Sequence, residues 1–450
     1  PWRPFASAGV SAWRLRLLLT SGLVAAVFPG PPGADSAASA SSCPQDGDDG
    51  QCVVAAGGAG GASAATSADG AAGGDALHAL RWRPFPYRVT NPKMRRWIYG
   101  GDFVKAAFLA EGLGRPVDGD EWDILWTHRP QHRVLDALDL PPRSGRRLVN
   151  HCEYFMAAGD KCALARHARV AADLVDNASA VHLPSFELRD PEQAEEWRRL
   201  VLLQPDQHWL LKPCNAGNSQ GIEIHKGQAA LDARGAADAR TVAQAYLERP
   251  YMGFGDRKFH LRLYVLVTRW SPVAAFLYDD GLVFRSRHAH RPGEARSGAR
   301  DAFSGISGDV EALPLSTLWA ALDRSEVWAR ILALLGALLG GRAERSFGAF
   351  GPLERRRGYA CFDLLGADVL LDDALRPAVM EFNIGPNLWV DNHGSEHKAG
   401  LLAVKEPLIA QVVRWAARRS ASPPDSAAAA DALEAAALVN FTRLPVPLSA

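Results

Sequence analysis

Residues 361–383, CFDLLGADVLLDDALRPAVMEFN, decide the fold of this chain. Two apolar runs with strand composition flank residues 373–376 (DALR), which form a turn signal four residues long. The stretch therefore predicts an antiparallel hairpin. A loop of this length places Asp372 opposite Pro377, and that pair sets the register of the whole ladder.

Three side chains with oxygen atoms lie on the predicted hairpin. In the expected register Asp368 lies opposite Glu381, and strand alternation puts Asn383 on the same face as Glu381. Opposed Cβ atoms on a ladder are about 5 Å apart, and two carboxylates that close either share a proton or hold a cation. The economical interpretation is a Mg²⁺ ion bound by all three residues. The alternative is a solvated hairpin face with unremarkable acids.

A strand upstream of the hairpin carries positive charge. Residues 258–267, KFHLRLYVLV, alternate between an apolar face and a face that contains Lys258, His260 and Arg262. Burial of the apolar face leaves Lys258 and Arg262 projecting together, where they can hold a triphosphate or a carboxylate. The alternatives are a solvated strand face and, for His260, an ordinary neutral histidine.

Two further segments suit a nucleotide. Residues 208–224, HWLLKPCNAGNSQGIEI, predict a strand that ends at Lys212, a glycine-containing loop able to approach phosphate oxygens, and a returning strand. Residues 242–251, VAQAYLERPY, predict an extended hinge whose backbone, with Gln244, can face an adenine edge. Each segment alone has a plainer alternative: a hairpin with a surface lysine, and a linker.

Composition limits the functional classes. The chain has 450 residues with 50 Lys+Arg and 50 Asp+Glu, so it has no overall basic field for nucleic acid or a membrane surface. Its six cysteines form no CxxC pair, which argues against a zinc ribbon and a disulfide-dense scaffold and favours a soluble, reduced protein. The apolar residues 331–339 are too few to span a bilayer, so they predict a core helix rather than a transmembrane helix.

The order of compositions along the chain predicts its domains. Residues 1–30 have the basic, apolar and small segments of a signal peptide, with an alanine-biased leader of no targeting role as the alternative. Residues 31–76 are rich in Ala, Gly and Ser and predict disorder. We expect them to be followed by an N-terminal lobe (77–152), a central domain (153–250), a C-terminal domain (251–420) and a peripheral tail (421–450).

Taken together and in this order, the motifs resemble the tubulin–tyrosine ligase-like family, whose fold is an ATP-grasp. The resemblance covers residues 84–418, and two stretches carry most of it: QAYLERPYMGFGDRKFHLRLYVLV (244–267) and CFDLLGADVLLDDALRPAVMEFNIGPNLWVD (361–391). It implies a mixed α/β (α+β) fold. A small N-terminal α/β lobe would precede central and C-terminal domains that enclose a nucleotide cleft.

The resemblance also implies roles by position, with ATP and Mg²⁺ as cofactors. The implied metal ligands are Asp368, Glu381 and Asn383. The implied nucleotide-binding residues are Lys161, Lys212, Gln244, Ala245, Tyr246, Leu247 and Lys258. Arg262 matches an arginine that faces the transferred phosphate or a substrate carboxylate, and Arg285 is the nearest counterpart of a second catalytic arginine. Asn150 and His151 match the stretch entering the central domain, and Lys405 matches a lysine of the closing helix whose role is structural or catalytic.

The sequence departs from the family pattern in four places. His260 stands where the family usually has Asp, and Ser219 stands where it usually has Gly. One extra residue precedes Arg285 in GLVFR. No HLTN-like segment lies between Arg285 and Trp319, where residues 303–308 (FSGISG) take its place. These departures concern the amino-acid side of the site more than the ATP side.

The implied activity is that of an ATP-dependent carboxylate–amine ligase that modifies a protein carboxylate through an acyl phosphate. The resemblance points to the acidic tail of tubulin in microtubules as acceptor, to free glutamate as the added amino acid (polyglutamylation), and to a cytoplasmic, cytoskeletal or ciliary location. Arg95, Arg96 and residues 355–357 (RRR) are candidate landing sites for such a tail, or merely solvated charges. One alternative is a catalytically impaired pseudo-ligase that acts as a binding or scaffold protein. The other is a ligase with a non-tubulin acceptor, which a functional signal peptide would favour because it predicts a secretory location.

Overall fold

The computed structural model describes residues 82–84, 101–113, 122–127, 147–152, 156–171, 183–216, 221–234, 240–270, 272–290, 310–340, 359–388, 390 and 394–446. They belong to one compact unit that spans residues 69–450. Several expectations lie outside the described residues: the leader, the disordered segment, Arg95 and Arg96, Ser219, and residues 303–308 and 355–357.

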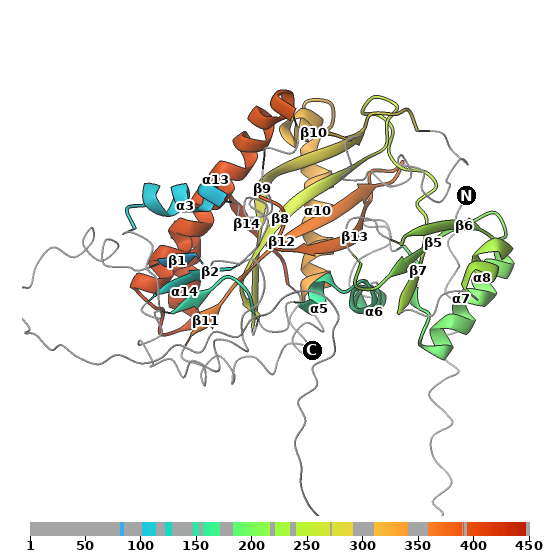
Figure 1. Cartoon of the computed structure of the whole chain (residues 1–450), viewed down its shortest axis with the longest axis horizontal. Coiled ribbons are helices and arrows are strands. Elements are labelled where there is room, and N and C mark those ends of the chain that lie inside the picture. Colours follow the sequence, from blue (N-terminus) through green and yellow to red (C-terminus); the bar gives the residue numbers. More distant parts are fainter. Residues whose placement is uncertain are drawn as a thin grey trace, which may run out of the picture. The chain divides into compact units, whose positions relative to one another are not determined.

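An antiparallel sheet forms the centre of this unit (Figure 1). Its strands run in the order β10 (Val310–Pro314), β9 (Val273–Ser286), β8 (Phe259–Trp270), β12 (Asp363–Leu371) and β13 (Pro377–Ile384). A short strand, β14 (Phe441–Arg443), pairs with β9. The strand expected over 258–267 is therefore present as β8, and β12 and β13 form the expected hairpin.

Both faces of the central sheet are buried. Odd-numbered residues of β8, such as Leu261 and Leu263, pack into one core together with helix α10 (Arg324–Leu339). Even-numbered residues, such as Tyr264 and Leu266, pack into a second core with helix α13 (Gly394–Ala421). The alternative of a solvated strand face on β8 is therefore wrong. The core helix expected over 331–339 is confirmed within α10, and no described helix is long and apolar enough to cross a membrane.

A second sheet comes from the expected central domain. It is antiparallel and runs in the order β4 (Ser185–Glu187), β7 (Thr241–Ala245), β5 (His208–Pro213) and β6 (Glu223–Lys226). Its helices are α5 (Met156–Gly159), α6 (Lys161–Ala171), α7 (Pro191–Leu203) and α8 (Gln228–Arg234). Asp190 begins α7 as its N-cap, because its carboxylate accepts hydrogen bonds from the next free backbone N–H groups and a proline fills the first turn.

The N-terminal lobe is built on a small parallel sheet. Its order is β1 (Trp82–Pro84), β2 (Ile124–Trp126), β3 (Leu148–Val149) and β11 (Ala360–Cys361), accompanied by helix α3 (Gly101–Ala110). The side chain of Asn150 accepts from the Thr127 N–H at 2.6 Å and donates to its carbonyl at 2.8 Å, and His151 Nε2 lies 3.0 Å from that carbonyl. Asn150 and His151 therefore join the ends of two strands of this lobe.

The tail is part of the fold rather than peripheral. Helices α9 (Ser316–Trp319) and α14 (Ala427–Ala437) complete the described helices, and β14 follows α14 directly. Ala437, Leu438 and Phe441 lie in the core that covers the even face of the central sheet. The expectation of a peripheral tail was wrong because the tail buries its few large apolar residues against β9.

Two disulfides correct the prediction of a reduced protein. Cys152 is bonded to Cys361, and Cys162 is bonded to Cys214, with Cα atoms 5.2 and 5.3 Å apart. The partners are 209 and 52 residues apart in sequence, so the fold alone brings them together. A search for CxxC pairs detects only cysteines that are close along the chain and could not find these bonds.

Candidate functional site

Three strands bring the charged side chains of the site into one row. The ladder pairs Arg262 of β8 with Asp368 of β12, and Asp368 with Glu381 of β13. Partners across a ladder point to the same face of a sheet, so the three side chains project together. The sequence predicted the pair of acids correctly, and the structure adds Arg262 to their row.

The expected register of the hairpin is wrong near its turn. Leu371, rather than Asp372, lies opposite Pro377, because Asp372 turns its carboxylate back to accept from the N–H groups of Ala374 and Arg376. The ladder then shifts by one residue between Asp368 and the next pair. This irregularity restores the expected register exactly where the acids lie; without it, Asp368 would face Met380.

Arg262 holds Asp368 in place within the sheet. Its Nη2 donates to Asp368 Oδ2 at 3.0 Å and its Nε to Oδ1 at 2.5 Å, and Asn383 Nδ2 donates to Oδ2 at 3.0 Å. Burial alone would raise the pKa of Asp368, but the charge of Arg262 and these hydrogen bonds lower it below its usual value. Asp368 is therefore a carboxylate at neutral pH.

A glycine makes room for this arginine. Gly366 lies between Tyr264 and Asn383 in the ladder, and a Cβ atom built on it would lie 3.0 Å from Arg262 Cδ and 3.1 Å from Pro386 Cβ. The arginine side chain therefore passes over a residue of β12 that has no side chain. Sequence reasoning missed Gly366, although a glycine within a strand is a recognised signal of close approach.

His260 is a neutral neighbour of the acids. Its Nε2 lies 4.0 Å from Asp368 Oδ1. Burial lowers the pKa of His260 to about 4, and the nearby Asp368 only partly opposes this. The position that departs from the family pattern thus carries an uncharged ring at pH 7.

Lys161 connects the row of charges to the second sheet. Its Nζ donates to the carbonyl of Ala216, in the loop after β5, at 2.7 Å and lies 3.2 Å from Glu381 Oε2. The lysine is buried, whereas 30% of the Glu381 side chain is exposed. Lys161 therefore joins the hairpin to the loop that follows β5.

Lys212 lies in a pocket beside Lys161. Its Nζ donates to Gln244 Oε1 at 2.7 Å, and Gln244 Nε2 donates to Ser185 Oγ at 3.0 Å. Gln244 was expected at an adenine edge, but here its side chain orients Lys212. Burial lowers the pKa of Lys212 to about 8. The pocket also has apolar walls, which come from Leu164, Ala165, Leu334, Leu338, Val379 and Met380.

Lys258 and the expected hinge lie together. Lys258 Nζ donates to the Tyr246 hydroxyl at 2.9 Å and lies 4.2 Å from the centre of its ring. Gln207 Nε2 donates to the Tyr246 carbonyl at 2.9 Å, so the hinge backbone is fixed to the start of β5. Ala245 and Leu247 are buried on either side of Tyr246.

Arg285 lies apart from the row. It pairs with Phe259 in the ladder, so its side chain is on the odd face of the sheet, opposite to the face of Arg262. Its guanidinium donates to Glu311 at 2.8 and 3.0 Å. Arg285 follows the extra residue in GLVFR, and a shift of one residue along a strand moves a side chain to the other face.

Lys405 of α13 is a buried cation on the even face. It is 2% exposed, and burial, followed by repulsion from Arg262, lowers its pKa to about 7.

The donor set of the hairpin fits magnesium. Asp368 and Glu381 supply carboxylate oxygens, and Asn383, which uses its amide nitrogen on Asp368, retains a carbonyl oxygen. Hard oxygen ligands of this kind are those that Mg²⁺ prefers.

Sequence reasoning also missed Ser185, the hydrogen-bond partner of Gln244, since a single serine in a short strand gives no signal.

Comparison with known proteins identifies the family of this chain. The model of the tubulin-tyrosine ligase family matches residues 145–296 and 313–427, more than half of the chain. The chain is 28% identical over 292 residues to the tubulin monoglutamylase TTLL4 of Homo sapiens, covering 60% of this chain and 23% of that protein. It is 24% identical over 313 residues to the tubulin polyglutamylase ttll6 of Danio rerio, covering 64% and 38%. The matched region thus spans well under half the length of these relatives.

A solved structure shares the fold. The C-terminal domain of K. lactis Pby1, an ATP-grasp enzyme that interacts with the mRNA decapping enzyme Dcp2, superposes with a TM-score of 0.52 at 18% identity. The match covers 82% of this chain and all of that domain. The fold is therefore an ATP-grasp, as expected, and the chain belongs to the tubulin-tyrosine ligase family.

Proposed function

We propose that this chain is an ATP-dependent ligase that joins an amino acid to a carboxylate of a protein. The γ-phosphoryl group of ATP passes to a carboxylate oxygen and ADP leaves. The amino group of the incoming amino acid then attacks the acyl phosphate, an amide bond forms, and inorganic phosphate leaves. The first acceptor to test is the acidic tail of tubulin, with glutamate as the added amino acid, because the relatives named above are tubulin glutamylases.

One observation carries the proposal: Arg262 binds Asp368, Asp368 lies opposite Glu381 in the hairpin ladder, and Glu381 pairs with Lys161, which reaches the loop after β5. This arrangement joins a cation that can stabilise a transferring phosphoryl group to the carboxylates of a candidate metal site. Lys212, which lines the pocket, and Lys258, which donates to the Tyr246 hydroxyl, supply further positive charge. Magnesium bound by Asp368, Glu381 and Asn383 would neutralise phosphate charge.

Labelled amino acids provide the direct test. Purified tubulin is incubated with ATP, the chain and labelled glutamate, glycine or tyrosine, and the wild type is compared with Glu381→Gln. The substitution keeps the size of the side chain and removes one charge, so incorporation should fall by at least about 100-fold. Binding of Mg-ATP to the wild type is measured in parallel, as the rise in its thermal unfolding midpoint when Mg-ATP is added.

The two measurements separate the outcomes. Incorporation that Glu381→Gln abolishes supports a tubulin ligase and identifies its amino acid. Nucleotide binding without any incorporation rejects tubulin as acceptor and leaves a pseudo-ligase or another acceptor. Failure to bind Mg-ATP rejects the ligase itself.

The disulfides favour a second candidate, a ligase of the same chemistry with a non-tubulin acceptor. Disulfides persist in oxidising compartments and are rare in the cytosol, where tubulin is found. Cys162 and Cys214, and also Cys152 and Cys361, are bonded in the structure. A protein that matures in the secretory pathway would act on acidic proteins of that pathway, and the incorporation assay repeated on a secretory-pathway extract tests this directly.

A further inference from the structure

A disulfide lies next to Lys161 and Lys212, which line the pocket that we propose binds the nucleotide, called the nucleotide pocket below. Cys162 follows Lys161 at the start of α6, and Cys214 follows Lys212 by two residues at the end of β5. Both cysteines are buried, with 0% and 1% of their surface exposed. The bond therefore joins the two elements that carry the lysines.

Backbone hydrogen bonds connect the same elements at the same place. The Lys161 N–H donates to the Cys214 carbonyl at 3.0 Å, and the Cys214 N–H donates to the Arg240 carbonyl at 2.9 Å. Two residues after Cys214, the Ala216 carbonyl accepts from Lys161 Nζ. The position of Lys161 over the loop thus depends on how closely α6 approaches residues 214–216.

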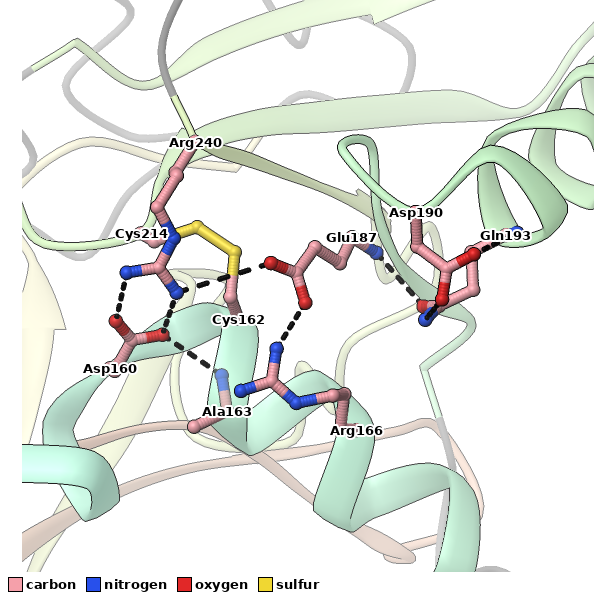
Figure 2. A network of polar contacts seen from close by, with 9 residues as sticks. All are labelled: Asp160, Cys162, Ala163, Arg166, Glu187, Asp190, Gln193, Cys214 and Arg240. Atoms are coloured by element: carbon pink, nitrogen blue, oxygen red, sulfur yellow. Dashed lines mark hydrogen bonds and ion pairs between the residues drawn. A yellow bond between two sulfur atoms is a disulfide. The ribbon is translucent and has the colours of Figure 1, made fainter. Parts of the chain in front are cut away.

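Charged groups surround the disulfide (Figure 2). Asp160 accepts from the Ala163 N–H at 2.9 Å, which caps α6, and it pairs with Arg240 at 3.2 Å. Glu187 of β4 pairs with Arg166 of α6. These pairs are partly exposed, and exposed ion pairs contribute little stability. The disulfide is the one covalent link that Figure 2 shows between α6 and the end of β5.

We propose that the Cys162–Cys214 disulfide is a positioning element of the nucleotide pocket. It holds Lys161 against both the Ala216 carbonyl and Glu381, and its reduction weakens nucleotide binding. This inference rests on the proposed ligase function and names a dependence of that same site on oxidation. Cys162 and Cys214 touch no substrate and act through Lys161.

Reduction of this bond follows ordinary thiol–disulfide exchange. The thiolate of a small dithiol attacks one sulfur, forms a mixed disulfide and expels the second cysteine as a thiolate, which takes up a proton. The second thiol of the reagent then displaces the first cysteine. Two protein thiols and one cyclic disulfide of the reagent result, because the reagent loses the two electrons that the protein disulfide gains.

The second disulfide supplies a matched control. Cys152 and Cys361 join the end of β3 to β11 in the N-terminal lobe, and neither element contributes a residue to the nucleotide pocket. The variant Cys152→Ala/Cys361→Ala therefore loses a disulfide without touching Lys161. The test variant is Cys162→Ala/Cys214→Ala.

Binding of the non-hydrolysable analogue Mg-AMP-PNP is measured by calorimetry on oxidised full-length protein. We expect the dissociation constant to rise at least tenfold in Cys162→Ala/Cys214→Ala and to change less than twofold in the control variant. A dithiol should reproduce the rise in the wild type. Equal affinity of the wild type and the test variant would overturn the proposal while leaving the ligase function intact. Failure of the oxidised wild type to bind would instead overturn the function on which it rests.

A double-mutant cycle covers the case in which the test variant is merely less well folded. In a Lys161→Ala background, loss of the Cys162–Cys214 bond should no longer affect affinity, since the bond acts through that lysine. An undiminished effect would assign the disulfide a structural role only. Asp160, Cys162 and Cys214 also place three ligand atoms within 4.8 Å, so zinc content is measured too. One equivalent of zinc with free thiols in the isolated protein would replace the disulfide and overturn the proposal.

Discussion

At the scale of single residues, Lys212 is a cation that the fold keeps from water before any ligand arrives. Burial lowers its pKa to about 8; Glu381 and Asp368 oppose this shift, whereas Lys161 adds to it. A bound triphosphate would favour the ammonium form and raise the pKa again. The free protein therefore loses the proton at a lower pH than the complex does.

This difference predicts a pH dependence of nucleotide affinity. Below pH 8 Lys212 is charged in both states, and affinity does not depend on its titration. Above pH 8 binding must take up a proton, so the dissociation constant of Mg-ATP should rise by up to about tenfold per pH unit. Calorimetry at pH 7, 8 and 9, in buffers with different ionisation enthalpies, measures both the affinity and the proton uptake.

Lys212→Arg is the control, since arginine keeps its charge throughout this range and leaves the titration of Lys405 unchanged. A variant with the same pH profile as the wild type would assign the titration to a group other than Lys212.

Gly366 is the second residue where the structure allows a specific prediction. A methyl group there meets Arg262 Cδ at 3.0 Å and Pro386 Cβ at 3.1 Å, so Gly366→Ala must displace one of them. We expect a loss of about 1–3 kcal/mol in the free energy of unfolding. Urea denaturation measures it. The cost should shrink in an Arg262→Ala background; if the two substitutions are strictly additive, the contact with the arginine is not what makes the glycine necessary.

At the scale of elements, the hairpin shows what the sequence could and could not predict. Its two strands, its turn and the pairing of Asp368 with Glu381 followed from residue pattern and spacing. The register at the turn did not, because Asp372 hydrogen-bonds to the turn backbone and the ladder shifts beyond it. The displaced pairing at the turn and the one-residue shift beyond it cancel each other. The predicted pairing of Asp368 with Glu381 was therefore correct, although the register assumed at the turn was wrong.

Other features depend on contacts that no local pattern contains. The face on which Arg285 projects changes with one inserted residue, and a motif comparison does not fix it. The role of Gln244 depends on Ser185, which comes from a strand 59 residues away. The cysteine pairs need the complete fold, since their partners come from different elements.

The tail illustrates the same limit and gives a prediction. A composition rich in Pro, Ala and Ser made residues 421–450 look peripheral. Yet Phe441 packs on Tyr278 with ring centres 5.1 Å apart, and Arg269 bonds Asp431 at 2.6 Å. A chain that ends at residue 421 should lose several kcal/mol of stability, since one buried phenylalanine alone is worth about 3–5 kcal/mol. Thermal and urea denaturation measure the loss. A chain that ends at residue 446 keeps α14 and β14 and is the control; equal midpoints for both truncations would contradict the packing role.

At the scale of the whole molecule, the two disulfides indicate the kind of cellular compartment in which the chain folds. One bond lies in the N-terminal lobe and the other in the central domain, and the loops that they close span 209 and 52 residues. Cross-links over loops of this length stabilise a chain by about 4–5 kcal/mol each in the chain-entropy picture. A fold that uses both is expected to mature where thiols are oxidised, and this expectation determines which acceptors the proposed ligase can meet.

The oxidation state inside the producing cells can be measured directly. Cells that make the full-length protein are lysed in denaturant with iodoacetamide, because the four cysteines are 5% exposed or less and a native protein would conceal free thiols. We expect Cys152, Cys162, Cys214 and Cys361 to remain unmodified, and to react only when a reductant precedes the reagent. Peptide mass spectrometry identifies each site. Alkylation of all four without reductant would show a thiol protein in a reducing compartment, which removes the argument for a secretory acceptor and leaves tubulin as the acceptor to test. Blocked thiols, together with no incorporation into tubulin, would direct the search for the acceptor to acidic proteins of the secretory pathway.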